Sequence, residues 1–268
     1  MTTATHVRPA TVVARSAAIA AADLAAVYTW RTWLFGWLGR VLAQVSFFTL
    51  VGRLLDRPDQ LTYLVLGNAV MTCVMEAMMV VASSSWERSL GTLPLLSSAP
   101  ARLFWVFVGR SLQWPVSGAG TSLVALFALG PLFGVRWQAG QVPAIVALVL
   151  LTALGTYCCG LFLAGLTINL PELRNIVSNA AYLLMMAFCG VQVPSAFWPG
   201  WVRAVAWPIP LTHTLAAVRR VAAGAGPADV LAPAALAVAV SGGWFAAAYL
   251  AFRVQERRGR RHGLLYLS

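Results

Sequence analysis

Long apolar segments separated by short polar breaks dominate this chain of 268 residues. An α-helix needs about 20 consecutive apolar residues to cross a membrane. Six segments have roughly that length: 33–54, 61–83, 110–133, 142–166, 175–193 and 229–252. Only 10% of the residues are charged, against about 25% in soluble domains. The sequence therefore predicts an all-α integral membrane protein with six transmembrane helices.

The arginines indicate which ends of these helices face the cytoplasm. All 19 basic residues are arginine, and an even number of spans places both termini on one side. If that side is the inner one, twelve arginines lie in inner segments and six in outer segments. Basic residues concentrate on the cytoplasmic side of membrane proteins, so we predict that both termini are cytoplasmic. The net charge of +11 then serves orientation and contact with anionic lipid, and no soluble basic face for nucleic acid is present in the sequence.

The chain divides into three parts. Residues 1–32 form a polar tail and an alanine-rich helical segment that Arg15 and Asp23 make too polar for a span, which predicts an amphipathic helix lying in the membrane interface. Residues 33–252 form the six-span domain, and residues 253–268 form a basic cytoplasmic tail. The four cysteines lie in apolar runs without metal-ligand spacing, so we predict neither a disulfide nor a metal site.

The most polar internal part of the first half joins the second and third spans. Gly91, Pro94 and Pro100 interrupt it, which predicts one or two short helical turns on the membrane face. Such a short helix offers a soluble partner a surface to grip. The alternative is a solvated connecting loop.

Two charges lie inside predicted spans, where charges are costly and usually paired. Arg40 and Glu76 each lie seven residues from the inner end of their span, which is roughly 10 Å at 1.5 Å per residue. Equal depth on consecutive antiparallel spans predicts an ion pair that locks the two helices together. The alternative places Glu76 on a cavity wall, where it would contact a cationic or polar substrate.

The connection between the fifth and sixth spans is apolar but broken by prolines, and its pieces are too short to cross the membrane. Irregular backbone enters a membrane only where protein or water satisfies its polar groups. We therefore predict a re-entrant helical hairpin in the outer leaflet, with three tryptophans near the lipid headgroups and His213 as a capping or interfacial residue rather than a catalytic base. Its marked residues are Trp198, Trp201, Trp207, Pro208, Pro210 and His213.

Motifs for catalysis are missing from the sequence. A phosphate-binding P-loop cannot be completed without lysine, and neither the zinc-protease motif nor the nucleophile elbow occurs. We therefore predict that the chain is not an enzyme and has no catalytic, cofactor-binding or metal-binding residues. Any energy for its work must come from a partner.

The segment Glu87-Arg88-x-x-Gly91-Thr92-Leu93-x-Leu95-Leu96-x-x-x-Pro100-x-Arg102 closely resembles the signature of ABC exporter permeases of the type-2 class. The stretch from Gly190 to Arg219, with its Pro208-Ile209-Pro210-Leu211-Thr212-His213 core, is similar to the family's outer region. The resemblance implies a cytoplasmic coupling helix between spans two and three that docks on an ATPase subunit, with Glu87 making a charged contact. Its expected contact residues are Trp86, Glu87, Arg88, Gly91, Thr92, Leu93, Pro100 and Arg102, with Glu172 in the Pro171–Asn175 turn as a secondary contact.

The resemblance also implies a working unit of two permease subunits and two ATPase subunits, the permeases forming a homodimer or a heterodimer. ATP and Mg would bind the partner ATPase, and no cofactor would bind this chain. The family exports drugs, polyketide antibiotics, lipo-oligosaccharides, glycans and lipids. Spans rich in Ala, Leu and Val favour a hydrophobic or amphipathic small molecule or a lipid, and the composition is typical of a bacterial plasma membrane protein.

Three other functions stay open at this point. A lipid-linked glycan exporter would expose more polar and aromatic side chains along its spans. An ion-coupled secondary transporter would carry internal repeats and paired broken spans. A membrane anchor for a signalling complex would have no use for the coupling segment.

Overall fold

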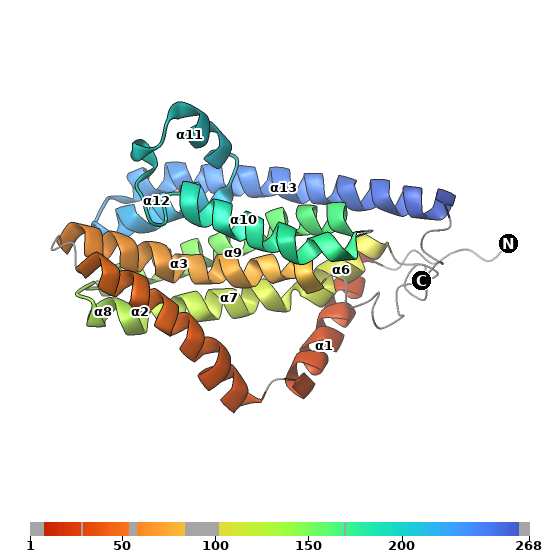
Figure 1. Cartoon of the computed structure of the whole chain (residues 1–268), viewed down its shortest axis with the longest axis horizontal. Helices are drawn as coiled ribbons and strands as arrows, with labels where there is room; N and C mark the ends of the chain where they lie inside the picture. The colour runs from red at the N-terminus through yellow and green to blue at the C-terminus, as the bar shows by residue number, and fades with distance from the viewer. Residues whose placement is uncertain (1–7, 28, 54–57, 84–101, 169, 263–268) are drawn as a thin grey trace.

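The computed structural model describes residues 8–27, 29–53, 58–83, 102–168 and 170–262 (Figure 1). Within these ranges the secondary structure is helical and contains no strand. Six helical stretches are long and apolar enough to cross a membrane: Pro9–Ala26, Thr32–Gly52, Gln60–Ser83, Leu103–Leu132, Ala139–Thr167 and Pro227–Arg258. The prediction of an all-helical protein with six such helices is confirmed.

Five of these stretches coincide with predicted spans, and the remaining one differs. Helix α10 covers only Arg174–Phe188, shorter than the predicted span 175–193, because the chain turns at Gly190 with a φ of 80°. Helix α1 (Pro9–Val27), predicted to lie in the interface, takes the sixth place by length and composition. Helix α13 (Pro227–His262) also continues past residue 253, where we placed the start of the basic tail.

Helix α3 (Pro58–Ser83) is the centre of the bundle. It packs against α2 (Gly39–Arg53), α7 (Gln113–Val124), α9 (Val142–Thr167) and α10. Small residues allow this close packing: a Cβ added to Gly160 of α9 would lie 2.5 Å from Val80 Cγ1, and one added to Gly118 of α7 would lie 2.9 Å from the Cys73 carbonyl oxygen. Small residues at helix contacts are what drives association in a membrane, where no hydrophobic effect acts between helices.

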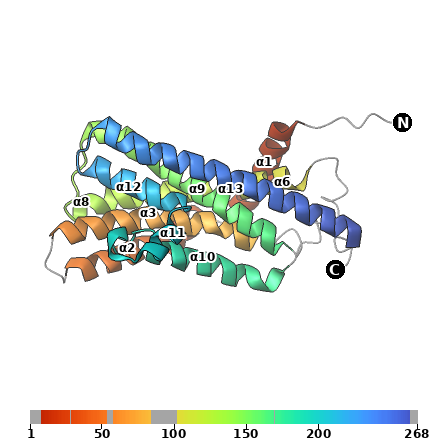
Figure 2. The same cartoon turned by 90° about the horizontal axis from the view of Figure 1, so that it is seen from above.

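The outer layer of the bundle follows α9 in the chain and in space. Helix α13 packs along α9, and α12 (Pro210–Ala222) packs on both (Figures 1 and 2). The short helix α11 (Gly200–Ala206) projects from the bundle beside α10. In the most apolar stretch of α3, 83% of the residues are buried, whereas in that of α13 only 6% are buried. Helix α13 therefore offers much of its surface to lipid or to a partner.

The helix ends gather at two ends of the bundle. The end of α3, the start of α6 (Leu103–Ser111), the start of α10 and the end of α13 lie at one end (Figure 1). The starts of α3 and α13 and the short helix α8 (Gly130–Leu132) lie at the other. Short helical turns complete the chain: the π-helices η1 (Thr32–Leu38) and η2 (Ala125–Leu129), and the 3-10 turns η3 (Ala139–Gln141), η4 (Pro171–Leu173) and η5 (Ser195–Phe197).

Helices α1 and α2 diverge from the bundle axis and converge on each other (Figure 1). Helix α1 packs on α6, and α2 tilts away from α3 toward its own first residues. Thr29 and Thr32 close the junction with hydrogen bonds, among them Thr32 Oγ1 to the Thr29 carbonyl at 2.9 Å. The divergence leaves a groove between α1, η1 and α7.

Candidate functional site

Most of the predicted ATPase-coupling residues lie outside the described part of the chain: Trp86, Glu87, Arg88, Gly91, Thr92, Leu93 and Pro100. Their two ends are described. Helix α3 ends at Ser83, and Arg102 precedes α6 in an extended conformation and donates a hydrogen bond to the Tyr249 hydroxyl of α13. Glu172 lies exposed in η4 at the same end of the bundle. Arg102 and Glu172 thus lie at the end of the bundle where α3 ends and α6 begins.

Helix α1 packs against α6, the first helix after the coupling segment in the chain. Gly109 lets the backbones meet, because a Cβ there would lie 2.5 Å from the Val13 carbonyl oxygen and 2.6 Å from Ser16 Cβ. An ion pair joins Arg110 Nη2 to Asp23 Oδ2 at 3.1 Å. In the sequence, Asp23 only interrupted an apolar run and Arg110 only marked a span boundary. Their opposite charges were the sequence feature that could have indicated the contact between α1 and α6.

Arg174 also differs from its sequence interpretation as a surface charge. Its side chain is 2% exposed, and it donates hydrogen bonds to the carbonyls of Thr167 at 3.4 Å and Ile168 at 3.2 Å. The last carbonyls of a helix have no partner within it, and a cation there is favoured by the helix dipole. Arg174 therefore caps α9 and fixes the turn that carries Glu172.

The predicted ion pair between Arg40 and Glu76 is not formed, although the structure describes both residues. Arg40 is exposed, with its guanidinium 5.7 Å from the centroid of the Trp37 ring, whereas Glu76 is 1% exposed. Equal depth in the membrane does not determine how each helix is rotated about its axis. The first span begins with the π-helical η1, whose wider turn shifts the face that later residues present.

Glu76 instead lies on the wall of a small pocket of about 40 Å³ between α3, η1 and α7. Its Oε1 atom is buried without a hydrogen-bond partner, and so is Oε1 of Gln113. The other principal lining residues are Trp33, Trp37, Met79 and Trp114. A buried polar atom without a partner is rare in proteins and calls for an explanation.

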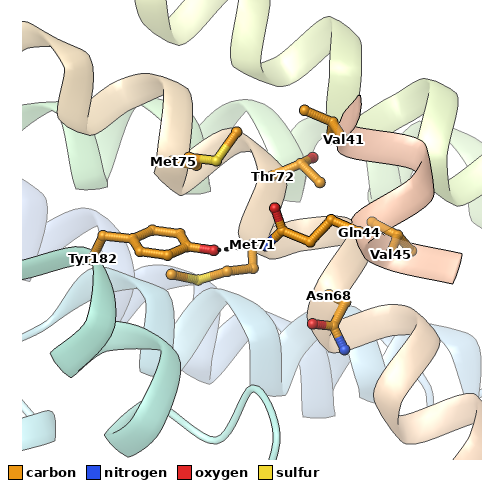
Figure 3. Close-up of a pocket in the computed structure, with 8 residues that line it drawn as sticks. All are labelled: Val41, Gln44, Val45, Asn68, Met71, Thr72, Met75 and Tyr182. Carbon is orange, nitrogen blue, oxygen red and sulfur yellow. Dashed lines mark hydrogen bonds between the residues drawn. The ribbon is translucent and has the colours of Figure 1, made fainter. Parts of the chain in front are cut away.

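A second, smaller pocket lies between α2, α3 and α10 (Figure 3). Gln44 Nε2 donates to the Tyr182 hydroxyl at 2.9 Å across it, and Gln192 Nε2 donates to Asn68 Oδ1 at 2.8 Å beside it. Its volume of about 10 Å³ is about that of one water molecule by the same measure. These polar side chains are satisfied by one another and hold three helices together.

The outer connection folds as two helices, α11 and α12, and its prolines and histidine lie at or near the helix ends. Pro210 opens α12 and lies on Gly155 of α9, where a Cβ would come within 2.8 Å of the proline ring. His213 Nε2 lies 2.7 Å from the Trp207 carbonyl oxygen, and Trp244 Nε1 donates to the Pro208 carbonyl at 2.6 Å. These contacts provide hydrogen-bond partners for backbone carbonyls in the irregular turn between α11 and α12.

The three tryptophans of this connection differ in exposure. Trp201 and Trp207 are 68% and 55% exposed. Trp198 packs against the Phe188 ring, at 5.4 Å between centroids, with its buried Nε1 lacking a protein acceptor. Exposed indole rings suit a membrane interface.

Arg219 ties this outer region to α3. Its guanidinium lies 3.3 Å from the centroid of the Tyr63 ring, and Nη2 donates to the carbonyls of Tyr63 at 3.2 Å and Val191 at 3.4 Å. Burial lowers the pKa of Arg219 to about 10, opposed by Tyr63, so the guanidinium remains protonated at neutral pH. This role of Arg219 could not be predicted from the sequence, because Arg219 and Arg220 are adjacent arginines and only the folded chain brings one of them against Tyr63 and Val191.

Comparison with known proteins gives one family. The family model described as ABC-2 type transporter matches residues 22–222, which spans helices α2 to α12 and the segment between α3 and α6. None of the curated proteins compared with the chain matches it.

Proposed function

Because the chain belongs to the ABC-2 type transporter family, in which it is a permease subunit that works with an ABC ATPase, we propose that it is the membrane half of an ATP-driven exporter. Its cargo is a hydrophobic or amphipathic small molecule, such as a drug or antibiotic, or a lipid, moved out of the cytoplasm or the inner leaflet. The protein resides in a bacterial plasma membrane with both termini in the cytoplasm. Hydrolysis of ATP, with its Mg, takes place on the partner.

This proposal rests on the place of the coupling segment in the chain. Residues 84–101 connect the end of α3, the most buried of the six membrane-length stretches, to the start of α6, on which α1 packs. A docking helix set between these elements moves α3 and α6 when the ATPase moves. Packed helices respond to such a push by shifting as rigid bodies, which is how nucleotide-driven motion reaches the spans.

The lining of the bundle supports the cargo class. The larger grooves among the described helices are lined mainly by Ala, Leu, Val and Trp. A lipid-linked glycan would need polar side chains along several spans, and the polar groups between α2, α3 and α10 are already paired. The glycan exporter is therefore the weaker alternative, and family membership argues against an ion-coupled transporter.

The working unit is two permeases and two ATPases, with the permeases most simply a homodimer. Helix α13 and parts of α2 and α10 expose large apolar side chains, among them Phe47, Leu184 and Leu250. Lipid or a second permease covers such surfaces. The first experiment concerns the ATPase.

The test is co-purification of the protein in detergent from its own membranes. We expect a stoichiometric protein that carries ABC ATPase motifs, identified by mass spectrometry. Glu87→Arg reverses the charge at the proposed contact. It should prevent the ATPase from co-purifying or abolish the stimulation of its ATP hydrolysis by the permease. The matched control is Asp229→Arg, an exposed carboxylate at the start of α13, at the opposite end of the bundle.

Two results would contradict the proposal. Transport that survives on ion gradients without any co-purified ATPase would overturn the ATP-driven exporter. An ATPase lost equally with Glu87→Arg and Asp229→Arg would overturn the docking site while leaving the permease assignment in place.

A further inference from the structure

The groove between α1, η1 and α7 opens beside the pocket that contains Glu76. It has a volume of about 530 Å³ and is lined by Ala17, Ala21, Ala25, Trp30, Leu112 and Val116, among others. The groove and the Glu76 pocket share Leu24, Trp33, Gln113 and Ser117. Sites for drug-sized ligands have volumes of about 300–1,000 Å³ and mostly apolar walls with few polar groups. The two cavities together have this form: an apolar groove that ends on a carboxyl group.

The polar atoms at the inner end specify the charge of the ligand. Glu76 Oε1 and Gln113 Oε1 are both hydrogen-bond acceptors, and both are buried without a partner among the described residues. Glu76 is 1% exposed, and an isolated carboxylate in apolar surroundings is strongly disfavoured. A ligand that donates N–H bonds and carries a positive charge would satisfy both oxygens.

The aromatic residues point to the same ligand. Trp33, Trp37 and Trp114 lie around the pocket, and indole rings attract cations over their faces more strongly than other aromatic rings do. Arg110 pairs with Asp23, and the exposed Arg40 lies over one of these rings, with its guanidinium 5.7 Å from the Trp37 centroid. The pocket thus combines a carboxyl group, an amide oxygen and indole rings, and its two buried oxygens accept no hydrogen bond from the residues that the structure describes.

The size of the pocket limits the head of the ligand. A volume of about 40 Å³ is about three times what one water molecule needs by the same measure. A primary or secondary ammonium group fits such a space and has the N–H donors that a quaternary ammonium lacks.

The close contact of α7 with α3 holds the pocket in shape before any ligand arrives. Gly118 lies against the turn that carries Glu76, since a Cβ there would come within 3.0 Å of Glu76 Cβ. This contact fixes the adjacent Ser117, and Gln113 five residues earlier on α7, relative to the carboxyl group. A preformed site binds more tightly because less ordering accompanies binding.

We propose that the Glu76 pocket and its groove bind an amphipathic organic amine, with the ammonium group on Glu76 and Gln113 and the apolar body between α1 and α7. This proposal rests on the proposed function and names its substrate class. The groove reaches the carboxyl group from the side of the bundle, between α1, η1 and α7. The amine therefore enters from the membrane rather than from the water.

Dansylcadaverine, a primary amine on an environment-sensitive fluorophore, tests this proposal with the full-length protein in phosphatidylcholine nanodiscs. Its N-acetyl derivative has the same body without the charge. We expect the amine to bind at least about tenfold more tightly than the acetylated probe, which corresponds to a cation–π and charge interaction of ordinary strength. Glu76→Gln should abolish this preference and leave the acetylated probe unchanged, whereas Asp229→Asn, on an exposed carboxylate at the start of α13, should change neither.

Equal binding of the two probes to the folded wild type, or an undiminished preference in Glu76→Gln, would overturn the proposal. If Glu76→Gln does not fold, the variants Gln113→Leu and Ala21→Trp test the proposal instead. The first should reduce the amine preference and the second should exclude both probes from the groove, and no effect of either would overturn the assignment. Loss of amine binding in phosphatidylethanolamine nanodiscs would assign the site to the lipid amine and overturn the small-molecule reading.

This experiment uses neither ATP nor an ATPase. Failure of amine binding therefore leaves the permease role intact. Amine binding without a co-purified ATPase would instead contradict the ATP-driven exporter alone.

Discussion

Arg219 is the residue whose loss should cost the outer half of the bundle most. Its guanidinium covers the Tyr63 ring and donates to two carbonyls, and Gly67 makes room for it, since a Cβ there would lie 3.1 Å from its Nη2 atom. Removing one partner of a buried polar contact leaves the others unsatisfied, at a cost of roughly 2–3 kcal/mol. We expect Arg219→Ala to lower the thermal unfolding midpoint in detergent by roughly 4–8 °C.

The neighbouring arginine supplies the control. Arg220 is exposed and donates from Nη1 to the Asp229 carbonyl at 2.6 Å. Arg220→Ala should shift the midpoint by much less than Arg219→Ala. Equal shifts would contradict the structural role of Arg219. Arg219→Lys should not restore the wild-type midpoint, because an ammonium cannot donate to two carbonyls and stack on a ring in the same geometry.

Arg40 and Glu76 allow a second test at the scale of single residues. Since the structure does not pair them, reversing both charges should rescue nothing. Glu76→Arg places a cation in a buried apolar site and should reduce the yield of folded protein severely, while Arg40→Glu, at an exposed position, should have a much smaller effect. The yield of monodisperse protein in the double variant should match that of Glu76→Arg alone. Restoration of the yield would revive the ion pair.

At the scale of helices, the attachment of α1 to α6 depends on the absence of a side chain at Gly109. A leucine there would overlap the Val13 carbonyl and Ser16 of α1, so Gly109→Leu should separate the two helices. We expect faster amide hydrogen exchange across residues 9–27. The control is Gly120→Leu on α7, where a Cβ meets no atom within 4 Å. Unchanged protection of α1 in Gly109→Leu would contradict the packing.

The long helices could be predicted because span length and hydropathy depend on the sequence locally. Helix α3 begins at Pro58 and α9 ends at Thr167, within a few residues of the predicted spans 61–83 and 142–166. The span predicted to begin at 110 in fact belongs to a helical stretch from Leu103. A hydropathy pattern treats Arg110 as a boundary, whereas tertiary pairing with Asp23 lets the helix pass through it.

The site could be predicted only in part, because rotation and tilt are properties of packing. Glu76 stood out in the sequence as a costly intramembrane charge, and that much was informative. Its surroundings of Trp33, Trp37, Gln113 and Trp114 depend on how η1 and α7 turn about their axes, which sequence depth does not encode. Arg174 and Arg219 were counted as surface charges for the same reason: burial of an arginine requires carbonyls that only the folded chain brings near.

At the scale of the whole molecule, helix α13 is too long to lie entirely within a membrane. Its 36 residues extend roughly 54 Å at 1.5 Å per residue, against a hydrocarbon thickness of about 30 Å. Arg253, Arg257 and Arg258 lie in its last turns, and Asp229 lies in its first. The basic end therefore extends into water beyond the headgroups, at the same end of the bundle as the starts of α6 and α10 (Figure 1).

This arrangement predicts which ends of the molecule a membrane-impermeant maleimide can reach. Single cysteines in place of exposed Glu172 and Arg257 should react in inside-out vesicles but not in intact cells. Cysteines in place of exposed Arg136 and Asp229, at the opposite end, should react in intact cells. The unmodified chain is the control, since Cys73, Cys159 and Cys189 are buried and Cys158 is half-buried.

The reverse pattern would invert the molecule, and the basic residues argue against it because they favour the cytoplasmic side. Reaction of Glu172→Cys and Arg257→Cys from opposite sides would be more damaging. The coupling segment leaves α3 at the end where both residues lie, so an ATPase could then not reach that segment and the basic tail from one compartment. Labelling of both positions from the cytoplasm would instead give the ATPase one continuous face, formed by the end of α3, the start of α6, the turn at Glu172 and the end of α13.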